Sequence, residues 1–365
     1  MPTLVLGIYA FSRIDYQQKL DFNQVLITPK RSNLNSRSEV ALERTFTFKN
    51  GQTWTGVPII CANMSSTGTF EVYDVLREYK MITALHKFYQ YSDYAEHIQK
   101  CDEKGAPMDF DYCMVSVGIG DHEYDKLENL CELLPIKWIC IDIANGYIPK
   151  FLEFCKKVRT RFPDKILVAG NVATPDMVNT LCLEGDVDII KCGIGPGSAC
   201  TTRLKTGVGI PQLSCIMDCG DAAHGVNKYI VGDGGITCPG DLSKAFCAGA
   251  DFVMMGGVFA GHDENPGELI QKSSTNGIVA KYKLFYGMSS THAMMKFYGK
   301  KDDYRASEGK VVEIPYKGKL KDTLEDYLGG VRSTCTYIGS KCIKHMPKCT
   351  TFVLTSQQLN NIFKS

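Results

Sequence analysis

A glycine-rich loop with one cysteine carries the residues best suited to chemistry in this sequence. It runs from 191 to 209 as KCGIGPGSACTTRLKTGVG and begins within an apolar run typical of a buried strand. Three glycines before the cysteine allow positive φ and let the backbone approach a ligand closely. Such a loop can present the Cys200 thiol, and a thiolate is a strong nucleophile. A plain turn and a small buried cysteine are the alternatives, and the loop alone excludes neither.

Glycine or asparagine also follows directly on several other apolar runs. These run ends are Ala62-Asn63-Met64, 142–146, Gly170-Asn171, Asp233-Gly234-Gly235 and Gly256-Gly257. In a barrel of parallel strands the active site lies at the carboxyl ends, and the loops after strands 7 and 8 frequently bind phosphate. The last two glycine pairs stand at those positions, so the expected ligand is a sugar phosphate or a nucleotide. Tight strand-to-helix turns are the alternative.

Eight short apolar runs are the predicted strands that would position these loops. They cover residues 57–61, 81–84, 112–117, 138–143, 166–169, 188–191, 229–231 and 252–255. Segments with helical period lie between most of them, at 68–79, 123–134, 148–158, 174–184, 211–223 and 239–248. Continuous apolar strands alternating with helices predict a parallel sheet buried on both faces, and eight of them favour a closed (β/α)8 TIM barrel. A Rossmann sheet would need G-x-G-x-x-G after its first strand, and that motif is absent there.

The other segments are predicted to be attachments to a single barrel domain spanning 20–365. Residues 1–19 form an N-terminal extension, and 20–37 suit an irregular surface arm. After the eighth strand, residues 261–322 interrupt the repeat with a long, charged, glycine-rich segment, which is typical of a mobile catalytic flap. A short helix at 323–328 and the stretch 329–337 then complete the barrel before an irregular tail.

Charge and cysteine content restrict the function class. Lys plus Arg number 41 against 40 Asp plus Glu, so the net charge of +1 favours a small-molecule partner over nucleic acid or an anionic membrane. The 16 cysteines are scattered and form no C-x-x-C, which indicates reduced cytosolic thiols. A tail group, Cys335, Cys342, His345 and Cys349, lacks the spacing of a known zinc finger and is not favoured as a metal site. No apolar run approaches the roughly 18 residues of a membrane helix.

Ten segments together resemble the IMP dehydrogenase and GMP reductase superfamily, and most closely its reductase branch. They are LDFNQVLITPKRS at 20–32, ALHK at 84–87, IDIANGY at 141–147, AGNV at 169–172, GIGPGSACTTR at 193–203, GDGG at 232–235, ADFVMMGG at 250–257, FYGMSS at 285–290, YRASEGK at 304–310 and GGVRSTCTY at 329–337. GPGSxCxT is shared across the superfamily, whereas RASEGK and RSTCTY are typical of the reductases. The resemblance implies a homotetramer of barrels that converts GMP to IMP and ammonia with NADPH.

The same resemblance implies the catalytic residues. Cys200 would attack C2 of the purine, and loss of ammonia would leave a covalent thioimidate that hydride from NADPH then reduces. An amino group leaves poorly unless it is protonated. Thr202 and Glu308 match the family's proton-delivery pair, although neither stands out by residue type.

The resemblance further implies binding positions, with Asp233 on the ribose and the glycine pairs on the phosphate. For the nucleotide they are Ser198, Asp233, Gly234, Gly235, Gly256, Gly257, Gly287, Met288, Ser289, Arg305, Ala306, Ser307 and Gly309. For NADPH they are Lys87, Asp142, Ile143, Ala144, Ile194, Gly195, Met288, Tyr304, Arg305, Ser333, Thr334, Cys335 and Thr336, with Ser36 and Arg37 reaching in from a neighbouring subunit. For a monovalent cation, K⁺, they are Gly195, Gly197, Cys200 and Arg203.

The sequence departs from the dehydrogenase pattern in two places and from the superfamily in one. Only about eight residues follow His86 before the next helical run, too few for an inserted regulatory domain of CBS type. The flap offers Glu308 where dehydrogenases have an Arg-Tyr pair, and Ser65-Ser66 stands where the family usually has Asp-Thr. The alternatives are NAD-dependent oxidation of IMP to XMP and a nucleotide-binding regulatory protein built on an inactive barrel.

Overall fold

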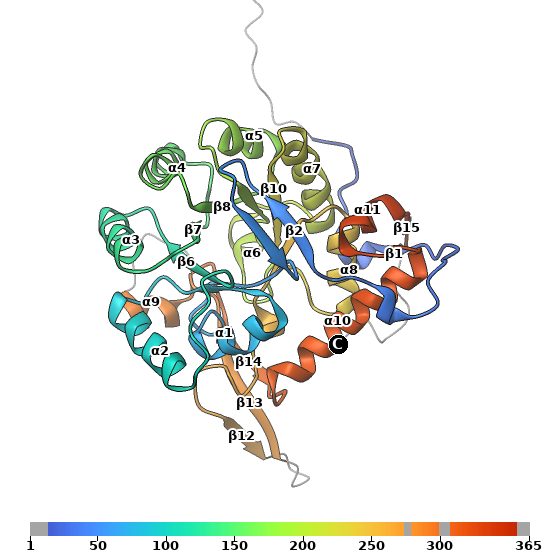
Figure 1. The fold of residues 1–365 in the computed structure, drawn as a ribbon. Helices are drawn as coiled ribbons and strands as arrows, with labels where there is room; N and C mark the ends of the chain where they lie inside the picture. Colours follow the sequence, from blue (N-terminus) through green and yellow to red (C-terminus); the bar gives the residue numbers. More distant parts are fainter. Residues whose placement is uncertain (1–13, 274–278, 299–306, 356–365) are drawn as a thin grey trace, which may run out of the picture.

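The centre of the molecule is a closed barrel of eight parallel strands (Figure 1). The computed structural model describes residues 14–273, 279–298 and 307–355. The barrel strands are β4 (Ile59–Cys61), β5 (Ile82–Leu85), β6 (Cys113–Val117), β7 (Trp138–Asp142), β8 (Ile166–Val172), β9 (Ile189–Cys192), β10 (Tyr229–Asp233) and β11 (Phe252–Met255). Nearly all of their residues are buried, because the interior and the surrounding helices cover both faces. All eight predicted strands are confirmed, with small shifts at their ends.

Helices surround the barrel. They are α1 (Phe70–Leu76), α2 (Tyr91–Glu103), α3 (Asp121–Leu133), α4 (Pro149–Arg161), α5 (Pro175–Leu183), α7 (Gln212–Gly225), α8 (Pro239–Cys247) and α10 (Leu320–Ile338). Proline occupies the first position of α4, α5 and α8, where its missing N–H costs no hydrogen bond. The six predicted helix ranges are confirmed, and α2 lies outside them.

The prediction for the last helix is wrong in length. A short helix at 323–328 was expected to end at the glycine pair, but α10 runs unbroken for 19 residues. Gly330 lies against Pro239 at the start of α8, and a Cβ at position 330 would approach the Pro239 Cβ to 2.5 Å. This glycine therefore allows close packing of two helices and does not end one.

A hairpin that the sequence patterns did not predict closes the amino end of the barrel. Its strands, β2 (Arg44–Thr47) and β3 (Thr53–Gly56), pair antiparallel, and β2 crosses the barrel in Figure 1. Phe46 stacks on Phe252 with ring centroids 4.2 Å apart, and Trp54 meets Trp138 edge to face at 5.8 Å. Phe252 and Trp138 are the first residues of β11 and β7, so this aromatic cluster seals the end opposite the glycine-marked loops.

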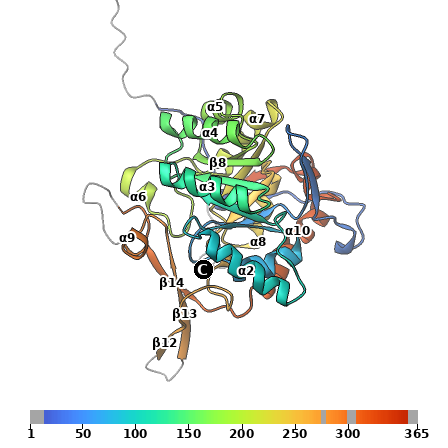
Figure 2. The ribbon, with the colours of Figure 1, turned by 60° about the vertical axis from the view of Figure 1, so that its left-hand side comes forward.

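The segment expected to be a mobile catalytic flap contains a sheet of its own. Strands β12 (Ile270–Ser273), β13 (Val279–Tyr286) and β14 (Val311–Pro315) pair antiparallel, and α9 (Thr291–Tyr298) lies between the last two. Figure 2 shows this sheet extending away from the barrel. The register pairs Tyr286 with Val311, which brings the residues just before β14 back to the mouth of the barrel.

The two terminal arms are largely irregular and meet in a small antiparallel sheet. Strand β1 (Val25–Ile27) pairs with β15 (Phe352–Leu354). Short helices complete the arms: η1 (Phe22–Gln24), η2 (Arg37–Glu39), η5 (Ile343–His345) and α11 (Met346–Cys349). All 16 cysteines are free thiols. Among the described helices, none combines the length and apolar character that crossing a membrane requires.

Candidate active site

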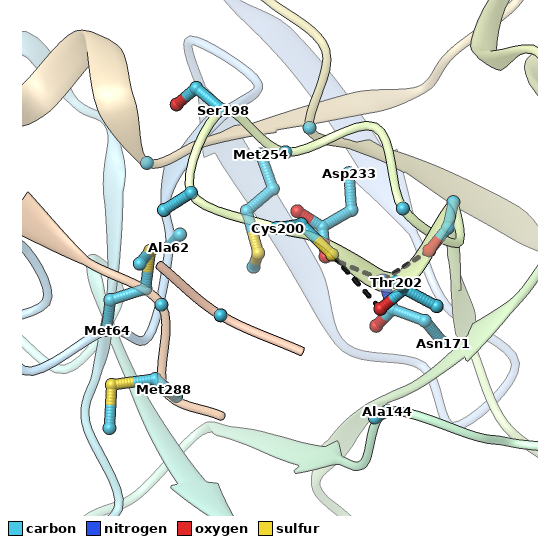
Figure 3. Close-up of a pocket in the computed structure, with 18 of the residues that line it drawn as sticks. Ala62, Met64, Ala144, Asn171, Ser198, Cys200, Thr202, Asp233, Met254 and Met288 are labelled. Carbon is cyan, nitrogen blue, oxygen red and sulfur yellow. Dashed lines mark hydrogen bonds between the residues drawn. The ribbon is translucent and has the colours of Figure 1, made fainter. Parts of the chain in front are cut away.

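A cavity of about 250 Å³ opens at the carboxyl ends of the barrel strands (Figure 3). It brings together most of the residues that the sequence singled out. The expected nucleotide-binding residues that line it are Ser198, Asp233, Gly234, Gly235, Gly256, Gly257, Gly287, Met288, Ser289 and Gly309. The expected cofactor residues that line it are Asp142, Ile143, Ala144, Ile194, Gly195 and Met288. Tyr304, Arg305 and Ala306 lie outside the described residues.

Cys200, Thr202 and Glu308 form a continuous hydrogen-bonded series at the wall of this cavity. The Cys200 Sγ donates to Thr202 Oγ1 over 3.2 Å, and Thr202 Oγ1 donates to Glu308 Oε2 over 2.6 Å. Figure 3 shows the first of these bonds, with Asp233 and Met288 at other sides of the same space. Each side chain is partly buried, so the series is held in place yet remains open to the cavity. A proton can therefore move between the carboxylate and the region of the thiol through the threonine hydroxyl.

Backbone pairing brings Glu308 to this position. Cys200 and Gly309 form an isolated antiparallel bridge, in which the Thr201 N–H donates to the Glu308 carbonyl over 2.7 Å and the Lys310 N–H to the Ala199 carbonyl over 3.0 Å. A Cβ at position 309 would come within 2.7 Å of the Ser290 nitrogen. Glycine is therefore required for the chain to pass this close. Ser307, also expected at the site, does not line the cavity, and its hydroxyl donates to the Ser289 carbonyl over 3.3 Å.

The floor of the cavity carries a buried ion cluster that residue-type reasoning missed. Lys191 is 1% exposed, and its ammonium bonds to Asp142 and lies 3.4 Å from Asp233. Burial alone would lower the pKa of Lys191, but the two carboxylates outweigh it and raise that pKa. Burial likewise raises the pKa of Asp142, and Lys191 more than offsets it, so that pKa lies below its ordinary value. The available signal was a lysine that follows two isoleucines at the end of the predicted strand 188–191.

Asn171 extends this cluster; the sequence places it at the end of a predicted strand and assigns it no role. Its Nδ2 donates to Asp233 Oδ2 over 2.8 Å and to the Gly193 carbonyl over 2.9 Å. The amide thereby fixes Asp233 relative to the loop that carries Cys200. Asp233 faces the cavity with a fixed carboxylate, the geometry expected of a group that accepts hydrogen bonds from a ribose.

The serine that replaces the family's usual aspartate is buried behind the cavity. The Ser65 N–H donates to the Met288 sulfur over 3.3 Å, and its hydroxyl donates to the Tyr286 hydroxyl over 3.2 Å. The Tyr286 oxygen also accepts from Lys296 over 3.2 Å. Ser65 therefore supports the cavity residue Met288 through neutral contacts. Ala62, Asn63 and Met64, which precede it, line the cavity and were absent from the expected binding set.

The four residues expected to bind K⁺ lie in one loop, but only three of them line the cavity. Gly195, Gly197 and Cys200 line the cavity, and the Gly197 carbonyl already accepts the Cys200 N–H over 3.0 Å. Arg203 does not line it. Its guanidinium bonds to the carbonyls of Ile194 (3.2 Å) and Ile210 (2.6 Å) and pairs with Asp21 (3.2 Å). The fit to a cation thus depends on backbone carbonyls, the donors that K⁺ prefers.

The other described residues expected to bind the cofactor do not line the cavity. Lys87 follows β5 and pairs with Glu123 at 3.7 Å. Ser36 and Arg37 belong to the η2 region, which packs against α10, the helix that carries Ser333, Thr334, Cys335 and Thr336. Cys335 is fully buried, and Thr334 bonds to Ser243 over 2.9 Å. The fold therefore gathers Ser36, Arg37 and the α10 residues at a second place, separate from Cys200.

Known proteins are similar to this chain over nearly its whole length. The sequence model of the IMP dehydrogenase / GMP reductase domain matches residues 19–360. The chain is 53% identical to GMP reductase 2 of Homo sapiens over 96% of this chain and 98% of that protein. It is 47% identical to GMP reductase of Ascaris suum over 97% and 98% of the two chains, and 50% identical to GMP reductase of Buchnera aphidicola subsp. Schizaphis graminum over 97% and 99%. The chain belongs to the IMP dehydrogenase / GMP reductase family.

Proposed function

We propose that this protein is a GMP reductase that converts GMP to IMP and ammonia with NADPH, within purine nucleotide interconversion. The observation that carries the proposal is the series from Cys200 through Thr202 to Glu308, because it couples a nucleophile to a proton source at one wall of a nucleotide-sized cavity. The names of relatives about half identical over nearly the full chain support the same activity.

In the proposed first half-reaction, the Cys200 sulfur bonds to C2 of the purine and the C2–NH₂ bond breaks. The departing nitrogen needs a proton, since an amide ion is a very poor leaving group. As the S–C2 bond forms, the Cys200 S–H proton passes through Thr202 Oγ1, 3.2 Å from the sulfur, to Glu308. Glu308 then returns a proton through Thr202 to the departing nitrogen. Ammonia leaves, and the purine stays attached to Cys200 as a thioimidate.

In the second half-reaction, the carbon–sulfur bond breaks as C2 becomes reduced and Cys200 recovers its thiolate. The nicotinamide, when bound, supplies the hydride for C2. The cavity continues from Cys200 to Asp142, Ile143 and Ala144, which supports binding of the cofactor next to the attached purine. The partly buried walls limit the access of water, which would otherwise hydrolyse the thioimidate to the product of the dehydrogenase reaction.

Substrate binding in this proposal uses one carboxylate and several glycine turns. Asp233, fixed by Asn171 and Lys191, accepts hydrogen bonds from the ribose hydroxyls. The phosphate lies at Gly234-Gly235 and Gly256-Gly257, where backbone N–H groups after the last two strands can reach it. A Cβ at position 257 would approach the Ser198 Oγ to 2.5 Å, so glycine leaves room there. Met288, Ser289 and Gly309, which line the cavity, would contact the base.

We further propose NADPH as the cofactor and a homotetramer as the working form. Ser36, Arg37 and Ser333 to Thr336 lie together but away from Cys200 in this chain, which supports a cofactor that spans two subunits. Arg37 would then pair with the 2′-phosphate. K⁺ would bind the carbonyls of Gly195, Gly197 and Cys200 and fix their loop. The part of the chain from residue 20 onwards acts as one barrel domain with 261–322 as its flap, and the free thiols fit a cytosolic location.

The test is an assay of the purified protein with GMP and NADPH. Consumption of NADPH with equimolar ammonia is expected, as is a GMP-derived covalent adduct by intact mass that is absent in Cys200→Ala. Cys131→Ser, which alters a thiol of α3 far from the cavity, should turn over like the wild type. Formation of XMP and NADH from IMP and NAD would instead identify a dehydrogenase, and GMP binding without turnover would identify a regulatory nucleotide-binding protein.

A further inference from the structure

A second group of reactive side chains lies in the helix layer around the barrel. Asp74 of α1 and His97 and Cys101 of α2 place one ligand atom each within 4.8 Å of one another. Within residues 14–273, 279–298 and 307–355 this is the one set of three or more such side chains that converges in this way. The tail cysteines and His345 do not converge. Helices α1 and α2 are neighbours in Figure 1, and none of the three residues lines the catalytic cavity.

The spacing of the three ligand atoms matches that around a tetrahedral metal ion. The Asp74 Oδ1 to His97 Nε2 distance is 3.2 Å, the His97 Nε2 to Cys101 Sγ distance is 3.4 Å, and the Cys101 Sγ to Asp74 Oδ1 distance is 4.0 Å. Zn²⁺ bonds of about 2.0 to 2.3 Å at tetrahedral angles place neighbouring ligand atoms about 3.3 to 3.6 Å apart. The observed triangle is therefore within about half an ångström of the required one.

Hydrogen bonding among these groups leaves one of them poorly satisfied. Both Asp74 and Cys101 approach the same ring nitrogen, His97 Nε2. If this nitrogen carries a proton, it serves the carboxylate, and the thiol must reach Asp74 across 4.0 Å. If it carries a lone pair, it accepts from the thiol but faces the carboxylate oxygen without a proton between them. A metal ion at the centre would satisfy all three atoms at once.

The surrounding residues hold the ligands in place. His97 and Cys101 are four residues apart on α2, so both face the same side of the helix. The His97 ring stacks on Phe70 of α1 with centroids 4.4 Å apart and planes 13° apart. Cys101 is 2% exposed and His97 9%, whereas the Asp74 side chain is 30% exposed. The site is thus closed on two sides and open at the carboxylate, where a metal ion and a fourth ligand from water can enter.

The local charge is compatible with a divalent cation. A carboxylate and a thiolate with a neutral imidazole give two negative charges, which Zn²⁺ balances. The positive charge that would repel a bound cation is that of Arg77, whose Nε lies 4.0 Å from Asp74 Oδ1. Its Nη1 donates to the carbonyls of Ala106 and Pro107 at 3.2 and 2.9 Å, which directs the guanidinium towards the loop after α2.

We propose that Asp74, His97 and Cys101 form a Zn²⁺ site that joins α1 to α2 on the outside of the barrel. The mixed oxygen, nitrogen and sulfur donors suit a borderline-soft ion and exclude Mg²⁺ and Ca²⁺, which prefer oxygen alone. The site takes no part in the reaction at Cys200. Its effect is to stabilise the pair of helices, because an ion that binds the folded chain shifts the folding equilibrium.

The test uses the purified full-length protein, stripped of metal under reducing conditions and titrated with Co²⁺ as a coloured substitute for Zn²⁺. One Co²⁺ per chain is expected, with visible bands of tetrahedral intensity and a thiolate-to-cobalt charge-transfer band in the near ultraviolet. Cys101→Ser should lose the charge-transfer band, and His97→Gln should weaken binding at least about tenfold. Cys131→Ser and His122→Gln are the controls, since they alter a thiol and an exposed imidazole outside the site, and both should bind as the wild type does.

Asp74→Asn covers the case in which a buried substitution fails to fold. Its side chain is partly exposed and nearly isosteric, so the variant should fold and bind Co²⁺ at least about tenfold more weakly with the charge-transfer band retained. Zn²⁺ should also raise the denaturation midpoint of the wild type, and at the same concentration it should raise that of Asp74→Asn by less. Absence of a one-to-one Co²⁺ complex, an unchanged charge-transfer band in Cys101→Ser, or wild-type affinity in Asp74→Asn would each overturn the proposal.

Discussion

Replacing Lys191 with methionine removes the buried charge between Asp142 and Asp233 while keeping most of the side-chain volume. At 3.4 Å from Asp233 and an effective dielectric constant of about 20, the attraction is about 5 kcal/mol before desolvation is counted. Asp142 is 35% exposed, so water screens its share. Removal of one partner from a buried pair costs about 3 to 5 kcal/mol, because a charge is left without a counterion.

Protonation of Asp142 or Asp233 in the variant reduces this loss of stability and makes it depend on pH. An aspartate of ordinary pKa takes up a proton at pH 7 for about 4 kcal/mol, and at pH 5 for about 1.5 kcal/mol. In the wild type the pKa of Asp142 lies below its ordinary value, so the stability it adds is complete above that value and is lost only in stronger acid. In Lys191→Met the main effect that lowers the pKa of Asp142 is gone, so burial and the second carboxylate raise that pKa against the weaker effects of Asn63 and Lys87. The loss should therefore be about 3 to 4 kcal/mol at pH 7 and shrink to about 1 to 2 kcal/mol at pH 5.

The assay is denaturant unfolding of both proteins at the two pH values, together with GMP binding by calorimetry. Lys228→Met is a matched control, because Lys228 is also buried and bonds to Asp186 and Asp188 at 3.0 and 3.1 Å outside the cavity. Both variants should lose stability, but only Lys191→Met should weaken GMP binding, by about tenfold or more, since it alone frees Asp233. A loss below about 1 kcal/mol at pH 7, or equal losses at both pH values, would refute the electrostatic reasoning.

Three further predictions test other parts of the molecule. Glu308→Gln should slow ammonia release about 10² to 10⁴-fold while exchange of hydride between IMP and the cofactor persists, because Thr202 then lacks a proton source; equal losses in both assays would contradict the relay. A hydrogen bond to Asp251 raises the pKa of His224. The stability that His224 adds to the fold is therefore complete below about pH 6.5 and fades as the pH rises. His224→Gln should lower the free energy of unfolding more near pH 6 than near pH 8.5. Trp54→Ala should cost about 3 to 5 kcal/mol in denaturant unfolding by opening the sealed barrel end, and a loss under about 1 kcal/mol would show that the hairpin is not a structural plug.

The barrel could be predicted because its signal is local. Each strand is a short, largely apolar run, since both faces are covered, and the six predicted helices show their own period. The hairpin β2–β3 could not be predicted because each of its strands has four residues and only one buried aromatic residue, Phe46 in β2 and Trp54 in β3. Their burial depends on aromatic partners at the starts of distant strands, and no local pattern reports that contact.

The flap sheet and the full length of α10 could not be predicted from the sequence, for related reasons. Strand β13 pairs with β14 across a helix and a long connection, so the alternation in each strand is interrupted before its partner appears. Gly329 and Gly330 predict the end of a helix, because each glycine inside a helix costs about 1 kcal/mol relative to alanine. Packing against Pro239 outweighs that preference, because a larger residue at 330 would keep α8 and α10 apart. Tertiary contact decided both cases.

Residue type identified only part of the candidate site. Cys200 stood out as a thiol among glycines, and Asp233 as a carboxylate before a glycine pair. Thr202 and Glu308 came from family resemblance alone, because a hydroxyl and a carboxylate 106 positions apart show no relation until the chain folds. Lys191 was overlooked inside an apolar strand, although a lysine in such a run must find buried counterions.

The contacts around Cys200 tie proton delivery to the position of the flap. Glu308 reaches Thr202 through its side chain, while its own carbonyl accepts the Thr201 N–H and the next residue but one, Lys310, donates to the Ala199 carbonyl. The nucleophile's loop and residues 308–310, just before β14, therefore form a short two-stranded contact, and the Glu308 carboxylate extends from it to Thr202. A displacement of the 308–310 backbone away from this loop would break the bond to Thr202 together with the backbone bonds on both sides of Cys200. In the proposed reaction, the same backbone contact therefore positions both the Cys200 thiol, which attacks C2, and the Glu308 carboxylate, which supplies the proton to the leaving amine.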